Sequence, residues 1–350
     1  MSPSPLSFGL AASSLLAVAL AGLLSAAIIW ISMPLLQRYA LVKPNVRSSH
    51  RVPTPQGAGI AVIAATLLVA SAWLAWSGIA IPLALLAATV TMALVGFADD
   101  LRSLPVLPRL VLQAAAVGIV VFTAPESLRI VPAFPLALER CLILLAAVWF
   151  LNLVNFMDGL DLMTVSEVVP ITAALLLLGW LGDLPWSASL IAAALCGAMM
   201  GFAPFNRPVA RVFLGDVGSL PIGLLLGWCL LQLAWQQHVT AALLLPAYYL
   251  ADSTTTLLRR IAKREPFWAA HRTHFYQRAT DNRFTVPRVI GEVFALNLLL
   301  ALLAIITVHT NSMVVTAMAL LAGAIAVGFV LRRFSRRRTG LTPEHFAPKA

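Results

Sequence analysis

The stretch LAASSLLAVALAGLLSAAIIW at residues 10–30 contains no charged side chain and is long enough to cross a bilayer as one helix. Comparable apolar runs recur along the chain, whose 350 residues are 60% apolar and only 11% charged. A soluble globular protein has roughly 45–50% apolar and about 25% charged residues. The composition therefore excludes a soluble globular domain and predicts an all-α, polytopic integral membrane protein.

Apolar runs of near transmembrane length predict eleven membrane-spanning helices in a single membrane domain that covers residues 1–350. The spans are expected at residues 10–34, 57–77, 79–97, 106–123, 138–156, 165–182, 186–204, 217–235, 240–258, 289–308 and 313–331. The first run is not expected to be a cleaved signal peptide. No Lys or Arg precedes it, and it is longer than the roughly 7–15 apolar residues at the centre of a signal peptide.

The basic residues predict the orientation of these spans. The first of them, Arg38, follows the first span, which favours a periplasmic N-terminus and a cytoplasmic C-terminus. The cytoplasmic segments are then about 35–57, 98–108, 155–165, 204–217 and 258–288, with a basic tail at 332–350. On this topology 22 of the 24 Lys and Arg residues are cytoplasmic, and only Arg129 and Arg140 lie opposite. The net charge of +10 is therefore a topology signal, and nucleic acid binding is not needed to explain it.

Acidic residues gather at the cytoplasmic ends of the predicted spans. They are Asp99, Asp100, Asp158, Asp161, Asp216 and Asp252. Ionisable groups near hydrocarbon are costly and mark functional sites. No Asp is expected at the middle of a span, where a proton or ion path would need one. The convergence predicts a metal and phosphate site at the inner surface of a bacterial cytoplasmic membrane.

The first acidic cluster is Gly96-Phe-Ala-Asp99-Asp100 at the end of the third span. Adjacent carboxylates repel each other, so a cation is expected to compensate them. Magnesium, with hard oxygen ligands, is the usual ion beside phosphates. The alternative for this pair alone is a solvated helix end.

The second cluster places Asn152, Asn155, Asp158 and Asp161 at intervals of three residues, and Gly159 is expected to end the helix. Amides and carboxylates together can bind a uracil ring and a metal phosphate. The alternative is a C-capping turn. A cap needs one polar residue, whereas this segment has four and no Lys or Arg.

The third cluster combines Asn206 with Phe213-Leu-Gly215-Asp216-Val-Gly218-Ser219, which opens the eighth span. The free N–H groups of a helix N-terminus attract an anion. A divalent cation would be needed between that anion and Asp216. The alternative is an ordinary Asp at a helix N-cap.

The fourth cluster is His271-Arg272-Thr-His274-Phe-Tyr-Gln-Arg, inside the most basic loop. Two His residues could bind zinc, but all three Cys residues are expected inside spans, so no third soft ligand is available. Imidazoles beside Arg suit phosphate oxygens. The alternative is a solvated basic loop.

In their order along the chain, the four clusters resemble the polyprenyl-phosphate N-acetylhexosamine-1-phosphate transferases of glycosyltransferase family 4. The resemblance covers about residues 43–290 and includes the first cytoplasmic loop, Arg47-Ser-Ser-His50-Arg-Val-Pro-Thr-Pro-Gln56-Gly-Ala58-Gly. It implies transfer of a sugar 1-phosphate from a UDP-N-acetylhexosamine to undecaprenyl phosphate, with release of UMP. It also implies Mg²⁺ as cofactor, with Mn²⁺ as the alternative.

The resemblance assigns roles to individual residues. The expected metal ligands are Asp216, Asp99 and Asp158. The expected catalytic residues are Asp99, as base or activator of the lipid phosphate, with Asp100, Asp158, His271 and His274. The expected substrate-binding residues are Asn152, Asn155, Asp161, Asn206, Phe213, Arg272 and His50. Three of these, Asp161, Asn206 and Phe213, match positions expected at the uracil ring.

The chain departs from the family pattern at a few positions. Leu162 replaces a Gly after Asp161, Gln56 replaces a frequent Arg, and Ala58 a frequent Gly. The form His-x-x-His resembles the branch that initiates O-antigen in lipopolysaccharide synthesis more than the peptidoglycan enzyme. This favours an N-acetylglucosamine or 6-deoxy-N-acetylhexosamine donor over a muramoyl-pentapeptide.

Other functions remain open at this point. A transporter or flippase of lipid-linked sugars would also have many spans, although it would need polar residues along a path through the bilayer. An inactive membrane scaffold is a further alternative. A phospho-N-acetylmuramoyl-pentapeptide transferase is the alternative within the family. The sequence also leaves open single or double displacement, and the oligomeric state, a homodimer included.

Overall fold

The computed structural model describes residues 5–42, 53–266, 271–310 and 312–336. The helices are α1 (Pro5–Tyr39), α2 (Gly59–Trp76), α3 (Leu83–Leu101), α4 (Val106–Phe122), α5 (Leu136–Met157), α6 (Met163–Leu181), α7 (Trp186–Asn206), α8 (Asp216–Trp235), α9 (Val239–Leu244), α10 (Ala247–Ala262), α11 (Phe275–Asp281), α12 (Val286–Thr310) and α13 (Met313–Phe334). Two short strands, β1 (Leu41–Val42) and β2 (Thr54–Pro55), pair antiparallel.

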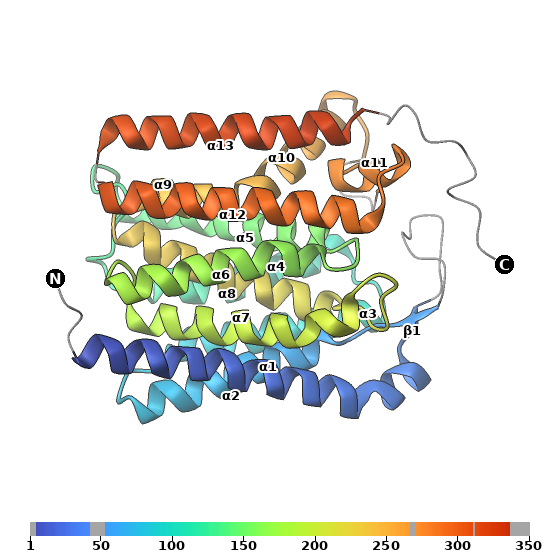
Figure 1. Ribbon diagram of the computed structural model, residues 1–350, viewed down its shortest axis with the longest axis horizontal. Helices are drawn as coiled ribbons and strands as arrows, with labels where there is room; N and C mark the ends of the chain where they lie inside the picture. Colours follow the sequence, from blue (N-terminus) through green and yellow to red (C-terminus); the bar gives the residue numbers. More distant parts are fainter. Residues whose placement is uncertain (1–4, 43–52, 267–270, 311, 337–350) are drawn as a thin grey trace.

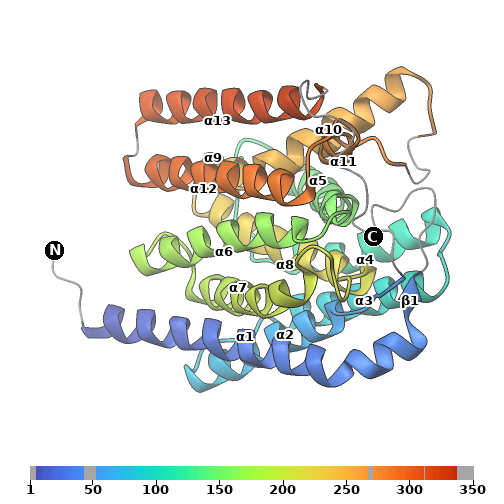
Figure 2. The ribbon, with the colours of Figure 1, turned by 45° about the vertical axis from the view of Figure 1, so that its right-hand side comes forward.

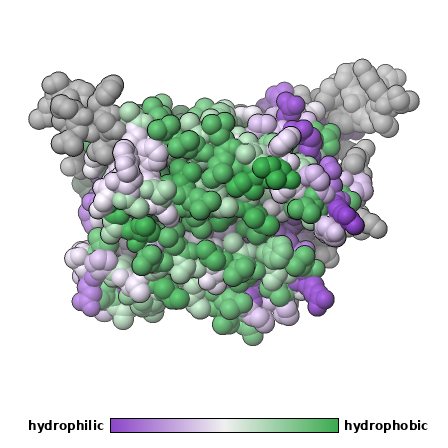
Figure 3. All heavy atoms as spheres, turned by 90° about the horizontal axis from the view of Figure 1, so that it is seen from below, coloured by the Kyte–Doolittle hydropathy of each residue, from purple (hydrophilic) through white to green (hydrophobic). Residues whose placement is uncertain are grey.

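The long helices lie side by side in one bundle (Figure 1). Within the described residues, nine of them are long and apolar enough to cross a membrane, and α4 is a shorter apolar helix. An apolar band covers the middle of the surface in Figure 3, and polar residues gather toward its edges. The prediction of an all-α, polytopic membrane protein is confirmed.

Ten of the eleven predicted spans correspond to single helices, and the ninth does not. The predicted span at 240–258 is wrong as one helix, because the segment divides into α9 and α10 at Pro246. Proline has no backbone N–H and its ring clashes with the preceding turn, so a helix ends there. The carbonyl of Pro246 then accepts the first hydrogen bond of α10, from Leu250 N–H (3.0 Å). Figure 2 shows α10 running obliquely to α12 and α13.

The described parts of the connections predicted to be cytoplasmic lie at one end of the bundle. At this end α3 and α5 finish, α8 begins, and β1 and α11 lie close by (right side of Figure 1). We call it the site end. The other end, which holds the connections 123–135, 182–185 and 236–238, is called the opposite end. The orientation of these two ends in a cell stays a prediction.

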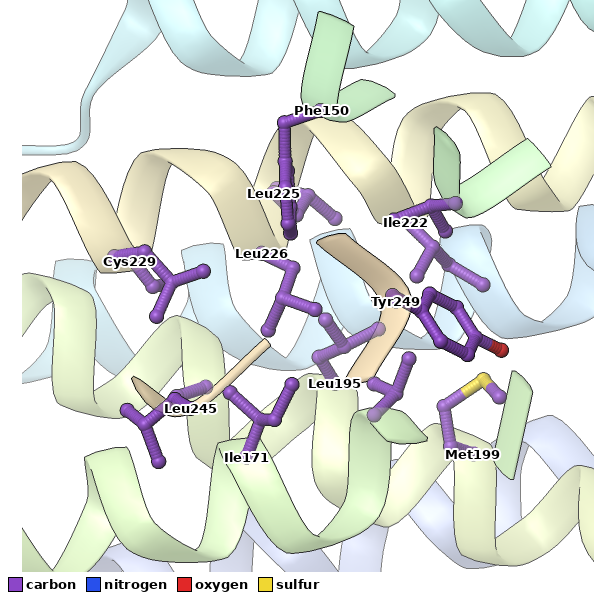
Figure 4. Packing of buried hydrophobic residues seen from close by; sticks show 14 of the residues in the cluster. Phe150, Ile171, Leu195, Met199, Ile222, Leu225, Leu226, Cys229, Leu245 and Tyr249 are labelled. Atoms are coloured by element: carbon purple, nitrogen blue, oxygen red, sulfur yellow. The ribbon is translucent and has the colours of Figure 1, made fainter. Parts of the chain in front are cut away.

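Helices α7 and α8 form the centre of the bundle and are the most buried of the candidate spans. Figure 4 shows Ile171 of α6, Leu195 of α7 and Leu226 of α8 meeting in one layer, with Tyr249 of α10 beside them. These side chains are buried. The packed centre holds the start of α8 fixed relative to the neighbouring helices.

Candidate functional site

The last turn of α3 packs on the first turn of α8. Gly96 lies so close to α8 that a Cβ at this position would overlap the backbone carbonyl of Asp216. Residues three and four positions further along a helix lie on the same face. The close contact at Gly96 therefore brings Asp99 and Asp100 to the start of α8.

Asp100 binds the N-terminus of α8. Its two carboxylate oxygens accept the backbone N–H groups of Asp216 (2.9 Å) and Val217 (3.0 Å). The side-chain amide of Gln56 donates a further hydrogen bond to the same carboxylate. A carboxylate in this place satisfies free donors of the helix and interacts favourably with its dipole. Gln56, at a position where the family often has Arg, is therefore part of the site.

Asp99 and Asp216 form the centre of the site. Their carboxyl groups interact directly with each other. Asp99 also accepts hydrogen bonds from Leu104 N–H (2.6 Å) and from the guanidinium of Arg109 (2.9 Å). The Asn155 amide donates to Asp216 (2.8 Å) and to the Ser219 hydroxyl (2.8 Å). Two carboxyl groups in contact require either a shared proton or a cation.

The donor set fits magnesium. Within the described residues no three His, Cys, Asp or Glu side chains form a group that could hold a metal ion on their own. Magnesium is often held by one or two carboxylates together with waters and substrate phosphates. Asp99 and Asp216 would provide the carboxylates, and an oxygen of Asn155 lies beside them because its amide group bonds Asp216.

The connection after α5 carries the other predicted acids. The pKa of Asp158 is raised to about 6, mainly by burial and also by the carboxylates of Asp100 and Asp161, against the lowering effect of the hydrogen bond from Thr164. The structure shows no direct contact between Asp158 and Asp216 among its hydrogen bonds, so the predicted role of Asp158 as a metal ligand stays a prediction. Asp161 accepts Ala210 N–H (3.1 Å).

Asn206 joins the two loops of the site. Its side-chain oxygen accepts Leu162 N–H (2.7 Å) and its amide donates to Val212 C=O (2.9 Å). Leu162 has φ +62°, the left-handed region that favours glycine. This explains why a Gly is usual here in the family that the sequence resembles, and the hydrogen bond that Leu162 N–H donates to Asn206 holds the Leu in that conformation.

Two predicted substrate-binding residues have other partners in the structure. The Asn152 amide donates to Gln113 of α4 (2.7 Å) and to Val148 C=O (2.8 Å) and is buried, so it joins α5 to α4. The backbone of Phe213 bonds to Pro55 and Gly57, which attaches the loop before α8 to the first predicted cytoplasmic loop. Their contact with a nucleotide stays a prediction. His50 lies outside the described residues.

The His motif precedes α11, and its second His, His274, is the N-cap residue of that helix. The rings of His271 and His274 lie 4.9 Å apart. The pKa of His271 is lowered to about 4, mainly by burial and also by the neighbouring His274 and Arg260. Arg272 is paired with Asp281 (3.1 Å) and bonded to Thr280 (3.0 Å) of α11. Of the predicted residues in this motif, His274 is the most buried.

Helix α11 is attached to the connection after α5. The Tyr276 hydroxyl donates to Phe156 C=O (3.1 Å), and a Cβ at Gly159 would overlap this hydroxyl. The ring of His274 lies 6.5 Å from that of Phe156. The His motif and the second acidic cluster, more than 100 residues apart in the sequence, are therefore neighbours.

An apolar cleft of about 270 Å³ begins near these groups, between α4, α5, α8, α9 and α10. Gly223, which lines it, lies seven residues after Asp216, or about two helical turns. The cleft continues along α8 to Ala234 near the opposite end. Its lining is apolar, and its volume suits a part of a long apolar chain.

Sequence reasoning missed several residues that build the site. Arg109 and Gln56 bind the two Asp residues of α3, and Asp252 binds the His motif. In the sequence, Arg109 is only one of the basic residues that indicate the membrane orientation of the chain. Asp252 was recognised as one of the few acids at a span end, and that scarcity was the signal that could have assigned it a role.

The three Asp residues that meet at the start of α8 lie within a segment that matches a family model. Residues 82–234 match the model of glycosyl transferase family 4. The family 4 segment includes both Asp residues of α3 and Asp216, and it ends before the His motif. The match covers less than half of the chain and agrees with the family that the motifs indicated.

Relatives of the family 4 segment include two kinds of enzyme. One is decaprenyl-phosphate N-acetylglucosaminephosphotransferase of Mycolicibacterium smegmatis, 28% identical over 57% of this chain and 54% of the relative. Another is phospho-N-acetylmuramoyl-pentapeptide-transferase of Symbiobacterium thermophilum, 32% identical over 51% of this chain and 60% of the relative. The enzyme of the same name from Chlamydia trachomatis is 30% identical over 38% of this chain and 40% of the relative. The chain thus spans about two to three fifths of these relatives.

Proposed function

We propose that this protein transfers a sugar 1-phosphate from a UDP-N-acetylhexosamine to undecaprenyl phosphate and releases UMP. The observation that carries the proposal is the contact between the carboxyl groups of Asp99 and Asp216 at the N-terminus of α8, beside an apolar cleft. The acidic groups suit a metal diphosphate, and the cleft suits a polyprenyl chain. The names of two relatives agree with this chemistry: one names a decaprenyl-phosphate N-acetylglucosaminephosphotransferase, and the other a phospho-N-acetylmuramoyl-pentapeptide-transferase.

In the proposed reaction, an oxygen of the acceptor phosphate forms a bond to the β-phosphorus of the donor. The bond between that phosphorus and the bridging oxygen breaks, and UMP leaves with the electron pair. Bound Mg²⁺, or Mn²⁺ in its place, would neutralise developing charge on the diphosphate. Asp99 and Asp216 hold this cation, and Asn155 orients Asp216 through its 2.8 Å hydrogen bond.

A single displacement is favoured over a route through an aspartyl phosphate. Hydrogen bonds and a cationic partner draw charge from a carboxylate and make it a weaker nucleophile. Asp100 binds two N–H groups of α8 and the Gln56 amide, and Asp99 binds Arg109 and Leu104. Both are engaged as acceptors. Phosphorylation of either Asp by donor in the absence of acceptor would contradict this route.

The donor sugar is proposed from the His motif. Its form favours an N-acetylglucosamine or 6-deoxy-N-acetylhexosamine donor and a role in starting O-antigen-type lipopolysaccharide. We place the protein in the bacterial inner membrane with the site end in the cytoplasm, where UDP-sugars are made. A panel of UDP-sugars that includes the muramoyl-pentapeptide donor, assayed for UMP release, separates the candidates.

The test of the function uses membranes that contain the full chain, UDP-N-acetylglucosamine, undecaprenyl phosphate and magnesium. We expect UMP release that depends on all components and that Asp216→Ala abolishes. The control is Asp183→Ala, an Asp at the opposite end whose partner, His238, lies 3.8 Å away. UMP release that persists in Asp216→Ala would contradict the assigned site, and transport of lipid-linked sugar without any UMP release would contradict the function.

A further inference from the structure

Asp252 is a buried carboxylate on α10 that no role described above uses. Its side chain is completely buried, and it lies where α10 meets the N-terminus of α11. A carboxylate in such a position is costly unless hydrogen bonds satisfy it. The identity of its partners therefore shows what it does.

Every group that contacts the Asp252 carboxylate can donate a hydrogen bond. Its Oδ1 accepts Phe275 N–H (3.0 Å), and its Oδ2 accepts Tyr276 N–H (3.1 Å). The hydroxyls of Thr256 and Tyr248 each lie at 3.3 Å. The ring Nδ1 of His274 lies 3.2 Å from Oδ1. A carboxylate with only donors around it is an acceptor at both oxygens, which describes its ionised form.

This arrangement determines the proton on the His274 ring. Because Oδ1 of an ionised carboxylate only accepts, Nδ1 of His274 must carry a proton to bond it. Nε2 is then the ring nitrogen left for another partner. A carboxylate also stabilises the imidazolium form when Nε2 takes a proton.

The ring of His274 is held from several sides. The titratable groups that face it are Asp252 of α10, His271 of its own loop and Tyr276 of α11, whose ring centroid is 5.8 Å away. Phe156 of α5 covers it from the connection after α5. The ring is therefore held between α10, α11 and the end of α5.

We infer that Asp252 is a positioning residue, which fixes the tautomer and orientation of His274 so that Nε2 faces the diphosphate of the UDP-sugar. This inference rests on the proposed function and deepens it. When the donor binds, Nε2 takes a proton from solvent and donates its N–H to a diphosphate oxygen. Asp252 stays ionised and stabilises the resulting imidazolium.

Asparagine cannot replace Asp252 in this role. Backbone N–H groups of α11 donate to both oxygens, so the NH₂ group of an Asn would oppose a donor on either side. If the NH₂ group took the place of Oδ1, it would face His274. It could donate to Nδ1 of His274 only if that nitrogen carried no proton, and the proton of the neutral ring would then be on Nε2. We therefore expect Asp252→Asn to lower kcat roughly 100-fold, because the imidazolium loses its carboxylate partner and a neutral His274 stabilises the diphosphate less.

A double-mutant cycle separates positioning from a structural role. His274→Gln is expected to lose as much kcat as Asp252→Asn, and the double variant is expected to lose no more than either, because Asp252 acts through His274. The control is Glu265→Gln, an exposed carboxyl paired with Arg260 in the same segment. Losses that multiply in the double variant would overturn the inference.

A measurement on the wild-type chain keeps the test valid if Asp252→Asn does not fold. ¹⁵N spectra of histidine-labelled protein, with the His274 signal assigned through His274→Gln, report which ring nitrogen is protonated. We expect a protonated Nδ1 in the wild type. A neutral ring with its proton on Nε2 would overturn the inference.

The two proposals fail in different ways. A wild-type protein that releases no UMP from any donor contradicts the proposed function. A wild-type protein that releases UMP, together with an Asp252→Asn variant of equal kcat, contradicts only the role of Asp252.

Discussion

The two ends of the bundle treat buried charge in contrasting ways. At the opposite end, Glu139 accepts hydrogen bonds from Arg129 and from Ile130 N–H (both 2.5 Å), so each charge has a partner of opposite sign or a backbone donor. At the site end, Asp99 is paired with Arg109 (2.9 Å), but Asp216 lies against Asp99 and has the neutral Asn155 amide as its side-chain donor. A carboxylate with a cationic partner is compensated within the fold, whereas one that faces another carboxylate needs a proton or a further cation. The difference indicates which end performs chemistry.

The largest expected effect tests this contrast at Asp216. Asp216→Asn keeps the shape of the side chain and removes its charge, so we expect UMP release to fall about a thousandfold, because a metal contributes several kcal/mol to such a step. Magnesium should raise the unfolding temperature of the wild type in detergent and leave that of the variant unchanged. The repulsion from Asp99 is also removed, so the variant without metal should be at least as stable as the wild type.

The control for Asp216→Asn is the chelation of wild-type protein with EDTA. Chelation should abolish UMP release, and added Mg²⁺ or Mn²⁺ should restore it. A variant that keeps both its activity and its stabilisation by magnesium would show that the contact between Asp99 and Asp216 does not hold the metal.

The second expected effect lies at the opposite end and concerns stability. Glu139→Gln leaves Arg129 without its carboxylate, which should lower the free energy of unfolding by about 2 kcal/mol. This is below the roughly 3–5 kcal/mol of a fully buried pair, because Arg129 is partly exposed to water. Thermal unfolding in detergent measures the loss, and kcat for UMP release should be unchanged. A kcat that falls with stability preserved would show that the opposite end takes part in the reaction.

Much of this arrangement could be predicted from the sequence. Long apolar runs predicted the spans because a bilayer allows few lengths and few charges. The order of the motifs predicted the family and the start of α8 as the centre of the site. The division at Pro246 was missed because hydropathy averaged over a long window continues through a single proline.

The hydrogen-bond partners of individual polar side chains could not be predicted from the sequence. Asn155 and Asn152 have the same spacing pattern, yet Asn155 bonds Asp216 while Asn152 bonds Gln113 of α4. Which neighbour an amide meets depends on the packing of other helices, and this is a long-range property. The contact of Asp252 with α11 spans more than twenty residues and depends on the oblique direction of α10.

The third expected effect compares the two ends of α6. Left-handed residues lie at both: Gly182 (φ +90°) at the opposite end and Leu162 (φ +62°) at the site end. A side chain in this region costs about 1 kcal/mol, so Gly182→Ala should lower the free energy of unfolding by about that amount. Leu162→Gly should change it by less than about 1 kcal/mol, because relief of strain offsets the lost packing of a half-buried side chain. Unfolding in detergent measures both.

The control for this pair is Leu160→Gly, a buried residue without a left-handed φ. It should lose about 2 kcal/mol or more, as buried Leu truncations do. A loss at Leu162 equal to that at Leu160 would show that no strain is stored at the start of α6.

The smallest expected effect concerns pH and compares His271 with His238 of the opposite end. Burial lowers the pKa of folded His271 to about 4, below its ordinary value near 6.5. Between these values the unfolded chain takes up a proton that the folded chain does not, so stability falls as pH decreases through this window. When the pH falls from about 7 to 5, His271→Asn should therefore lose less stability than the wild type. The control, His238→Asn, should show the same dependence of stability on pH that His271 gives the wild type. An unchanged slope in His271→Asn, measured by unfolding temperature, would mean that the pKa of His271 is the same in the folded and the unfolded chain.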